Sequence, residues 1–279
     1  MKSLMIQGTS SGAGKTTLVA ALCRIFSDKG YSVAPFKSQN MSNFAYVTPE
    51  FEISRAQAIQ AIGSRCKITP DLNPILLKPA GNYNSIVYLN GKRYKKMHAK
   101  EYYEKFVNSK GIDIAVKSLK TLQKNYDLVI LEGAGSPAEI NLQKFDIANM
   151  RIAQKANASV LLVSDIDRGG SFASLVGTMA LIEKKHQNLV RGFIFNKFRG
   201  DLDVLRPGFQ KLKNITKIPV IGTVPLIQLD LPEEDSLNAS PKDIQWTEKN
   251  ILKIDDELNK LAKIVKFNVD IKFIEKMLQ

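Results

Sequence analysis

The chain has 279 residues, of which 44% are hydrophobic and 24% charged, and a net charge of +13. These proportions are typical of a globular protein and exclude disordered and fibrous classes. No apolar run reaches the roughly 18–20 residues of a membrane span, so the sequence predicts neither a span nor a signal peptide. The two cysteines, Cys23 and Cys66, are too few for a disulfide framework and favour a reducing cytoplasmic location.

The positive charge comes mostly from lysine, and the lysines are not interleaved with aromatic residues. Nucleic-acid readers depend instead on arginine forks and aromatic stacking platforms. The densest basic run, 92–96, lies beside an Asn-Gly pair that predicts a hairpin turn. We therefore expect an anionic small-molecule substrate, with no nucleic-acid and no membrane partner.

Short apolar runs alternate with helix-length periodic stretches, the pattern of βαβ units on a parallel sheet. The predicted strands, rich in Val, Ile and Leu as strands buried on both faces must be, are 4–7, 32–36, 128–131, 160–163, 192–195 and 220–224. The predicted helices are 15–29, 53–63, 99–124, 147–155, 171–185 and 202–213. An interruption near 73–97 predicts a small hairpin insertion, and apolar spacing predicts closing helices over 247–278. The sequence thus predicts one α/β domain, 1–279, with a parallel sheet covered by helices on both faces.

The strongest motif joins the first predicted strand to the first predicted helix. Residues 8–17 read Gly-Thr-Ser-Ser-Gly-Ala-Gly-Lys-Thr-Thr, in the strand–loop–helix order of a phosphate-binding loop. Glycines let backbone N–H groups surround phosphate oxygens, and the helix N-terminus adds partial positive charge. We expect Lys15 to contact the β- and γ-phosphates of ATP and the Thr16 hydroxyl to bind Mg²⁺. The predicted nucleotide-binding residues of the loop are Thr9, Ser10, Ser11, Gly12, Ala13, Gly14, Lys15, Thr16 and Thr17.

Polar residues follow several other predicted strands, where open parallel sheets bind their ligands. Lys37 could neutralise a transferring phosphoryl group, although its polar run also suits a solvated loop. Glu132 ends a buried strand, where P-loop enzymes place a Mg²⁺-binding carboxylate; the alternative is an ordinary strand-capping glutamate. The run 165–170 fits either a carboxylate clamp or a helix cap. Asn196, at another strand end, fits a nucleotide-base contact, although asparagine is also a common strand-terminating residue.

Together these motifs resemble the synthetase domain of the cobyric acid synthase family. The matching runs are 7–15, 34–43, 132–142, 146–150, 165–170 and 195–201, with weaker agreement at 55–58, 73–79 and 231–237. They occur in the family's order from residue 1 to about residue 237. The loop form also resembles dethiobiotin synthetase, and it has Ser10 where septum-site and partition ATPases carry an additional lysine.

The resemblance implies a P-loop fold like that of dethiobiotin synthetase and ATP-dependent amidation of corrinoid carboxylates. In the family, adenosylcobyrinic acid a,c-diamide becomes adenosylcobyric acid at the b, d, e and g carboxylates, through acyl phosphates and ammonia. Lys15, Lys37 and Glu132 would be catalytic. Thr16, Glu132 and, more weakly, Glu52 would bind Mg²⁺, and Asn196 would contact adenine. The implied substrate-binding residues are Gln39, Asn40, Ser42, Asn43, Glu139, Asn141, Asp146, Asn149, Asp167 and Arg168.

The family normally continues into a glutaminase domain, whose cysteine nucleophile is activated by a histidine. Neither Cys23 nor Cys66 has such a context, so we expect no glutaminase domain within this sequence. Ammonia would come from a separate glutaminase subunit or from free ammonium, unless the chain is truncated; a homodimer is a further expectation. The alternatives are a cobyrinate a,c-diamide synthase, a dethiobiotin synthetase-like enzyme, a partition-type ATPase and a subunit that turns over only with its glutaminase partner.

Overall fold

The computed structural model describes residues 2–232 and 244–279. Its strands are β1 (Lys2–Gly8), β2 (Val33–Phe36), β3 (Gln39–Met41), β4 (Ala45–Val47), β5 (Glu52–Ser54), β6 (Ile75–Pro79), β7 (Asn84–Leu89), β8 (Lys92–His98), β9 (Leu128–Glu132), β10 (Ser159–Asp165), β11 (Val190–Phe198) and β12 (Val220–Pro225). Its helices are α1 (Lys15–Asp28), α2 (Arg55–Ser64), α3 (Ala99–Glu101), α4 (Ile112–Asn125), α5 (Met150–Ala156), α6 (Ser171–Leu181), α7 (Lys184–Gln187), α8 (Leu202–Thr216), α9 (Glu248–Asn268) and α10 (Ile271–Met277). Two 3₁₀ turns, η1 (Pro70–Leu72) and η3 (Gln143–Phe145), and a π-helix, η2 (Tyr102–Gly111), complete the described elements.

The central sheet has six parallel strands in the order β12-β11-β10-β1-β9-β2. Successive side chains of a strand face opposite sides: Leu4 and Ile6 join one hydrophobic core, and Met5 joins the other. Because both faces are covered, the strands are apolar almost throughout. The predicted doubly covered parallel sheet and each of its predicted strands are confirmed.

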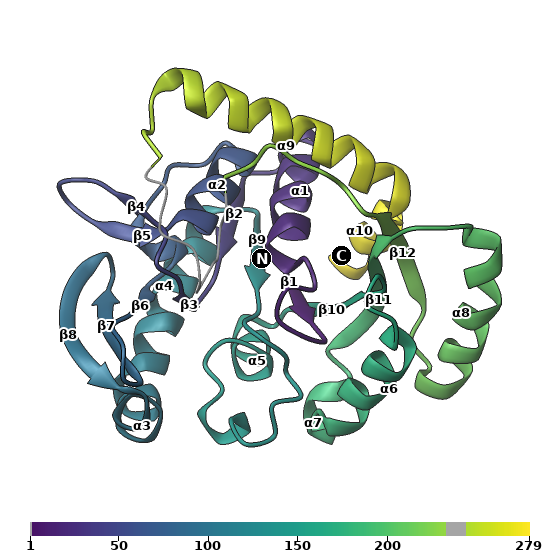
Figure 1. Cartoon of the computed structure of the whole chain (residues 1–279), viewed down its shortest axis with the longest axis horizontal. Helices are drawn as coiled ribbons and strands as arrows, with labels where there is room; N and C mark the ends of the chain where they lie inside the picture. Colours follow the sequence, from purple (N-terminus) through teal and green to yellow (C-terminus); the bar gives the residue numbers. More distant parts are fainter. Residues whose placement is uncertain (1, 233–243) are drawn as a thin grey trace.

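Helices pack against both faces of the sheet (Figure 1). One core joins α1 to the closing helices α9 and α10, and Figure 1 shows α9 crossing over α1 and α2. The other core contains residues of α4, α5, α6 and α8. The predicted closing helices are confirmed, although part of the run 231–237 lies outside the described residues. Among the described residues, no helix is both long and apolar enough to cross a membrane.

The predicted insertion is larger than a hairpin. Strands β7 and β8 pair antiparallel around Asn90 and Gly91, both at positive φ, as the Asn-Gly turn predicts. Strands β6 and β3 extend them to a four-stranded sheet. The prediction of a polar loop over 35–43 is therefore wrong in part, because Gln39–Met41 forms β3 and pairs parallel to β6.

Four predicted helices differ from those observed. The helix predicted to begin at 147 begins at Met150. The helix predicted to begin at 53 begins at Arg55, because β5 pairs with β4. The stretch 99–124 contains the π-helix η2, and Ile182 and Glu183 separate α6 from α7. Hydrophobic periodicity identifies such stretches but does not distinguish α from π winding or place short breaks.

The topology places the phosphate-binding loop at a switch point of the sheet. From β1, the chain crosses to β2 at one edge, whereas β10, β11 and β12 extend the sheet toward the other edge. The loop after β1 therefore opens into the crevice at the carboxyl ends of the strands, where such sheets bind ligands.

Candidate functional site

The glycines of the loop after β1 hold a conformation that other residues would not tolerate. Gly12 and Gly14 have φ of 73° and 92°, and Gly14 caps the N-terminus of α1. A Cβ at Gly14 would lie 1.9 Å from Asn196 Nδ2, and one at Gly8 would lie 2.8 Å from the Ser10 carbonyl oxygen. Next to Gly12, by contrast, the space is open. The loop thus presents its backbone to open space at the start of a helix, which suits phosphate binding.

Lys15 folds back across the loop and is buried. Its Nζ donates to the carbonyl oxygens of Ser10 and Gly135, at 3.0 Å each. The lysine thereby links the phosphate-binding loop to the segment that follows β9.

Two side chains at the end of β11 brace the same loop from outside. Asn196 Nδ2 donates to the Ala13 carbonyl at 2.9 Å, and Lys197 Nζ donates to the Gly12 carbonyl at 2.8 Å. Lys197 also pairs with Asp165 at 2.8 Å. These contacts hold both loop carbonyls toward the end of β11, and the predicted adenine contact of Asn196 stays a prediction.

Glu132, at the end of β9, is contacted by a side chain of α1 and by one from the segment between β2 and β3. Its Oε1 accepts from Thr16 Oγ1 at 2.9 Å and from Lys37 Nζ at 2.7 Å. Glu132 and Lys37 are 1% and 4% exposed, so the ion pair is shielded from water. The structure therefore brings together Lys37, Thr16 and Glu132, which lie far apart in the sequence.

Glu52 does not share these contacts. It forms an ion pair with Lys78 of β6, and its backbone N–H donates to the Gly91 carbonyl at 2.9 Å. Across residues 2–232 and 244–279, no three or more His, Cys, Asp or Glu side chains form a metal-binding group. The contacts of Glu52 thus connect it to the insertion sheet and give its predicted metal role no support.

Sequence reasoning missed two glutamines of this site, Gln57 and Gln60 of α2. Both are fully buried, and their Nε2 atoms lie 3.4 and 2.7 Å from Glu132 Oε2. They stand three residues apart on one face of a helix whose other residues are mostly alanine and isoleucine, a signal that could have identified them. Buried amides of this kind require hydrogen-bond partners.

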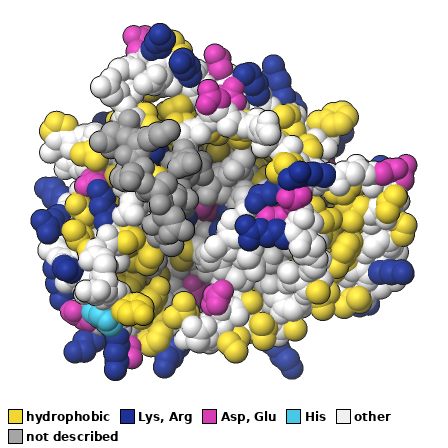
Figure 2. Space-filling model, viewed as in Figure 1, with side chains coloured by type: hydrophobic (Ala, Val, Ile, Leu, Met, Phe, Trp, Pro, Cys, Tyr) yellow, Lys and Arg dark blue, Asp and Glu magenta, His cyan; other side chains and the backbone are white. Residues whose placement is uncertain are grey.

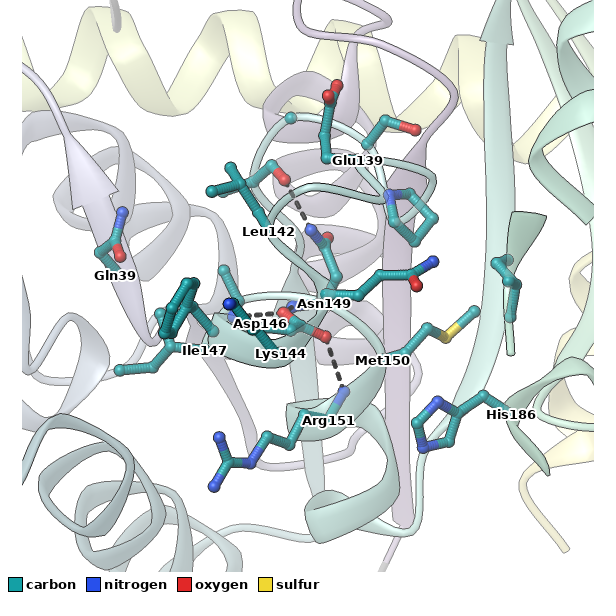
Figure 3. A pocket seen from close by; sticks show the side chains of 18 of the residues that line it. Gln39, Glu139, Leu142, Lys144, Asp146, Ile147, Asn149, Met150, Arg151 and His186 are labelled. Atoms are coloured by element: carbon teal, nitrogen blue, oxygen red, sulfur yellow. Dashed lines mark hydrogen bonds between the residues drawn. The ribbon is translucent and has the colours of Figure 1, made fainter. Parts of the chain in front are cut away.

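A cavity of about 770 Å³ adjoins the phosphate-binding loop, at Ser11, and the Gly135 segment that Lys15 contacts. Figure 3 shows side chains around it from β3, the β9–α5 segment and α7. The predicted substrate residues in its lining are Gln39, Glu139, Asp146 and Asn149. Those outside its lining are Asn40, Ser42, Asn43, Asn141, Asp167 and Arg168.

Asp146 and Asn149 are held in place by backbone contacts. Asp146 accepts from the backbone N–H groups of Ala148, Asn149 and Arg151, at 3.0, 2.7 and 2.8 Å (Figure 3). Asn149 Nδ2 donates to the Ala134 carbonyl at 2.7 Å. The Asp146 carboxylate therefore caps the start of α5, so that its role in the structure is to shape the cavity wall.

The predicted substrate residues outside the cavity either contact other residues of the protein or are partly or fully exposed to solvent. Asp167 pairs with Arg199 at 2.9 Å, and Arg168 is exposed, so the predicted clamp of 165–170 stays a prediction. Asn40 is buried and donates to Ser54 Oγ at 2.6 Å. Ser42 Oγ accepts from the Phe44 N–H at 3.0 Å. Asn43 is half-buried and Asn141 is exposed.

Both cysteines are free thiols. Burial raises the pKa of Cys23 and, less strongly, that of Cys66. A raised pKa favours the thiol over the nucleophilic thiolate.

Comparison with known proteins shows that the chain is similar to cobyric acid synthases. A probable cobyric acid synthase of Thermococcus kodakarensis is 55% identical, over 86% of this chain and 50% of the relative. The cobyric acid synthase of Lachnoclostridium phytofermentans is 44% identical, over 99% of this chain and 55% of the relative. The chain therefore spans about half the length of the curated relatives it matches.

Among solved structures, the MinD cell division protein of Aquifex aeolicus aligns with 81% of this chain and 83% of its own, at 15% identity and a TM-score of 0.45. The model of the CobQ/CobB/MinD/ParA nucleotide binding domain matches residues 4–237. The similarity to cobyric acid synthases confirms the resemblance inferred from the motifs. Since the domain model covers most of its length, the chain belongs to the CobQ/CobB/MinD/ParA nucleotide-binding domain family.

Proposed function

We propose that this chain is the synthetase part of a cobyric acid synthase, an ATP-dependent ligase that converts corrinoid carboxylates into amides. The observation that carries the proposal is the position of Lys15, Thr16, Lys37 and Glu132 near a cavity lined by both polar and apolar side chains. Ser11 of the phosphate-binding loop and Gly135, a partner of Lys15, both line that cavity. The identity of about half to cobyric acid synthases supports the same reaction.

The residues at the loop fit ATP and Mg²⁺. The open backbone at Gly12 leaves room for phosphate oxygens, and the N-terminus of α1 adds favourable partial charge. The Thr16 hydroxyl and the Glu132 carboxylate are hard oxygen donors, such as Mg²⁺ prefers, and they lie 2.9 Å apart. When bound, Mg²⁺ would neutralise charge on the β- and γ-phosphates.

The proposed reaction has two steps. A carboxylate oxygen of the substrate attacks the γ-phosphorus and ADP leaves, which produces an acyl phosphate. The lone pair of ammonia then attacks the acyl carbon, phosphate leaves with the carbon–oxygen bonding pair, and the nitrogen releases one proton. Lys15 and Lys37 stabilise the charge on the transferring phosphoryl group, so that catalysis is mostly positioning and charge neutralisation.

Lys37 has two partners in this proposal. In the structure its Nζ contacts Glu132 Oε1 at 2.7 Å. Entry of a phosphate group would offer the ammonium a second anion, and the flexible lysine stem allows it to be shared. Glu132 therefore holds Lys37 near the reacting phosphoryl group.

The cavity would hold the carboxylate that is to be activated. Gln39 accepts from the Tyr102 hydroxyl at 2.9 Å, which orients its amide and directs its N–H₂ group for donation to a carboxylate oxygen. A corrinoid exceeds a cavity of about 770 Å³ and would extend beyond it. Asn40, Ser42, Asn43, Asn141, Asp167 and Arg168 remain predicted contacts only. Ammonia would come from a separate glutaminase or from free ammonium, and a homodimer also remains a prediction.

The test is turnover of MgATP by the purified chain with adenosylcobyrinic acid a,c-diamide and ammonium, followed by product mass. Each amidation exchanges a hydroxyl for an amino group, so the steps at carboxylates b, d, e and g can be counted. Glutamine should replace ammonium only when a glutaminase is added. Tight ATP binding with no corrinoid product, with or without a glutaminase, would refute the proposal.

A related reaction on another acid is the alternative. Cobyrinate a,c-diamide synthases and dethiobiotin synthetases also activate carboxylates with ATP. Comparison of which acid stimulates ATP hydrolysis separates these reactions. Salt-sensitive retention on DNA, which phosphate contacts would produce, would instead favour a partition-type ATPase.

A further inference from the structure

Helix α2 places two amide side chains against the proposed metal-binding carboxylate. Gln57 and Gln60 are both 0% exposed, in a helix whose neighbouring residues are mostly alanine and isoleucine. A buried amide without hydrogen bonds would destabilise the fold by about 1–3 kcal/mol. The contacts that these glutamines make are therefore a specific part of the structure.

Gln60 joins two parts of the site at once. Its Nε2 donates to Glu132 Oε2 at 2.7 Å and lies 3.3 Å from the Thr16 carbonyl oxygen. One amide thus connects α2, the first turn of α1 and the end of β9. Hydrogen bonds to a charged acceptor are shorter and stronger than neutral ones.

Gln57 contributes more weakly to the same network. Its Nε2 lies 3.4 Å from Glu132 Oε2 and 3.4 Å from Gln60 Oε1. Its own Oε1 accepts from Asn40 Nδ2 at 3.4 Å. The longer distances make Gln57 a support for Gln60.

The two oxygens of Glu132 therefore have different surroundings. Oε1 faces Thr16 and Lys37, the groups proposed to act on ATP, whereas Oε2 faces the two glutamines. Donors on Oε2 prevent rotation of the carboxylate and keep Oε1 directed toward the nucleotide. Partners of this kind orient metal ligands, and their loss typically weakens metal binding about 10- to 100-fold.

We propose that Gln60 is a positioning residue that fixes the Glu132 carboxylate for Mg²⁺-dependent nucleotide binding. The inference rests on the proposed function, since it takes Glu132 as a metal ligand. A purely structural glutamine would instead affect nucleotide binding equally with and without metal.

The experiment compares binding of a fluorescent ATP analogue in Mg²⁺ and in EDTA. Gln60→Met keeps a similar side-chain length and removes the N–H donor. We expect the Kd in Mg²⁺ to rise about ten-fold and the Kd in EDTA to change less than about two-fold. Gln57→Met should change the ratio of the Kd in Mg²⁺ to the Kd in EDTA by a smaller factor. It provides the test of the proposal if Gln60→Met does not fold.

Gln123→Met is the matched control. Gln123 Nε2 donates to Ser3 Oγ and to the Ala156 carbonyl, at 3.0 Å each, near the amino end of β1 and away from the phosphate-binding loop. For Gln123→Met, the ratio of the Kd in Mg²⁺ to the Kd in EDTA should equal that of the wild type. An unchanged ratio in both α2 variants would overturn the proposal. A wild type without Mg²⁺ preference would remove the proposed metal site itself, and the role of Gln60 with it.

Discussion

Lys37 and Glu132 form an ion pair from which water is excluded. Removing one partner of a buried pair leaves an uncompensated charge, whereas replacing both can be neutral. Lys37→Met should therefore lower the free energy of unfolding by about 3 kcal/mol and abolish turnover. Urea unfolding and ATP-dependent amidation measure the two effects.

The double variant Lys37→Met/Glu132→Leu separates stability from catalysis. It should recover most of the lost unfolding free energy and remain inactive, because no charge is left buried while both reactive groups are absent. If the double variant were as unstable as the sum of both single variants, the two residues would not be coupled and the prediction would be wrong.

His186 of α7 lines the cavity and lies buried beside Gln154. Burial lowers the pKa of His186 below its ordinary value of 6.5, with Lys185 adding to the effect and Glu183 and Asp146 opposing it. The unfolded chain therefore binds this proton more readily than the folded one, and stability falls as the pH drops. Between about pH 7 and about pH 5.5, His186→Gln should lose less unfolding free energy than the wild type. Parallel stability–pH curves for the two proteins would contradict this.

Helices α1 and α9 are joined by an ion pair at their interface. Arg24 is fully buried, and its Nη2 contacts Asp255 and the Ile62 carbonyl. Asp255 is 34% exposed, so its removal costs less than breaking a fully enclosed pair. We expect Asp255→Ala to lower the unfolding free energy by about 2 kcal/mol. Asp256→Ala, at an exposed neighbour on the same helix, should change it by less than about 0.5 kcal/mol in the same urea titration.

Helix α2 connects the closing helix α9 to the candidate site around Glu132. Its Gln57 and Gln60 reach Glu132, while Ile59 belongs to the core that contains α1 and α9. A disturbance of α9 packing can therefore reach the carboxylate through a single helix. For this reason the variants of Asp255 are best examined for nucleotide binding as well as for stability.

At the level of the whole chain, the closing helices complete one of the two cores. Ile254, Leu258, Leu261 and Val265 are each at most 3% exposed. Burial of four such side chains contributes about 6–12 kcal/mol, comparable with the stability of an entire domain. A chain that ends at residue 243 should therefore lose cooperative thermal unfolding and bind a hydrophobic dye. A sharp calorimetric transition in that shortened chain would show that the fold does not need the closing helices α9 and α10.

The chain has a net charge of +13. On the face in Figure 2, Lys and Arg side chains are interspersed with acidic and hydrophobic ones and form no continuous stripe. This distribution suits attraction of an anionic small molecule. The absence of a nucleic-acid partner stays a prediction.

Much of the fold could be predicted from the sequence because its signals are local. The phosphate-binding loop, the apolar strands and the Asn-Gly hairpin each depend on neighbouring residues. Strand β3 could not be found in this way, since Gln39 and Asn40 lack the apolar pattern and pair only because β6 lies beside them. Thr16, Lys37 and Glu132 are in contact, as expected for residues near the carboxyl ends of neighbouring parallel strands.

The partners of buried polar groups depended on the three-dimensional arrangement. Glu52 pairs with Lys78, Asp146 caps α5, and Gln60 supports Glu132 from 72 residues away in the chain. A local sequence pattern indicates which residues are apolar. The hydrogen-bond partner of a buried polar side chain, by contrast, depends on which donor or acceptor the topology places beside it. The phosphate-binding loop could therefore be predicted from consecutive residues, because its signal is local. The contacts of Glu132 depend on the packed sheet and on α2, which only the tertiary structure brings together.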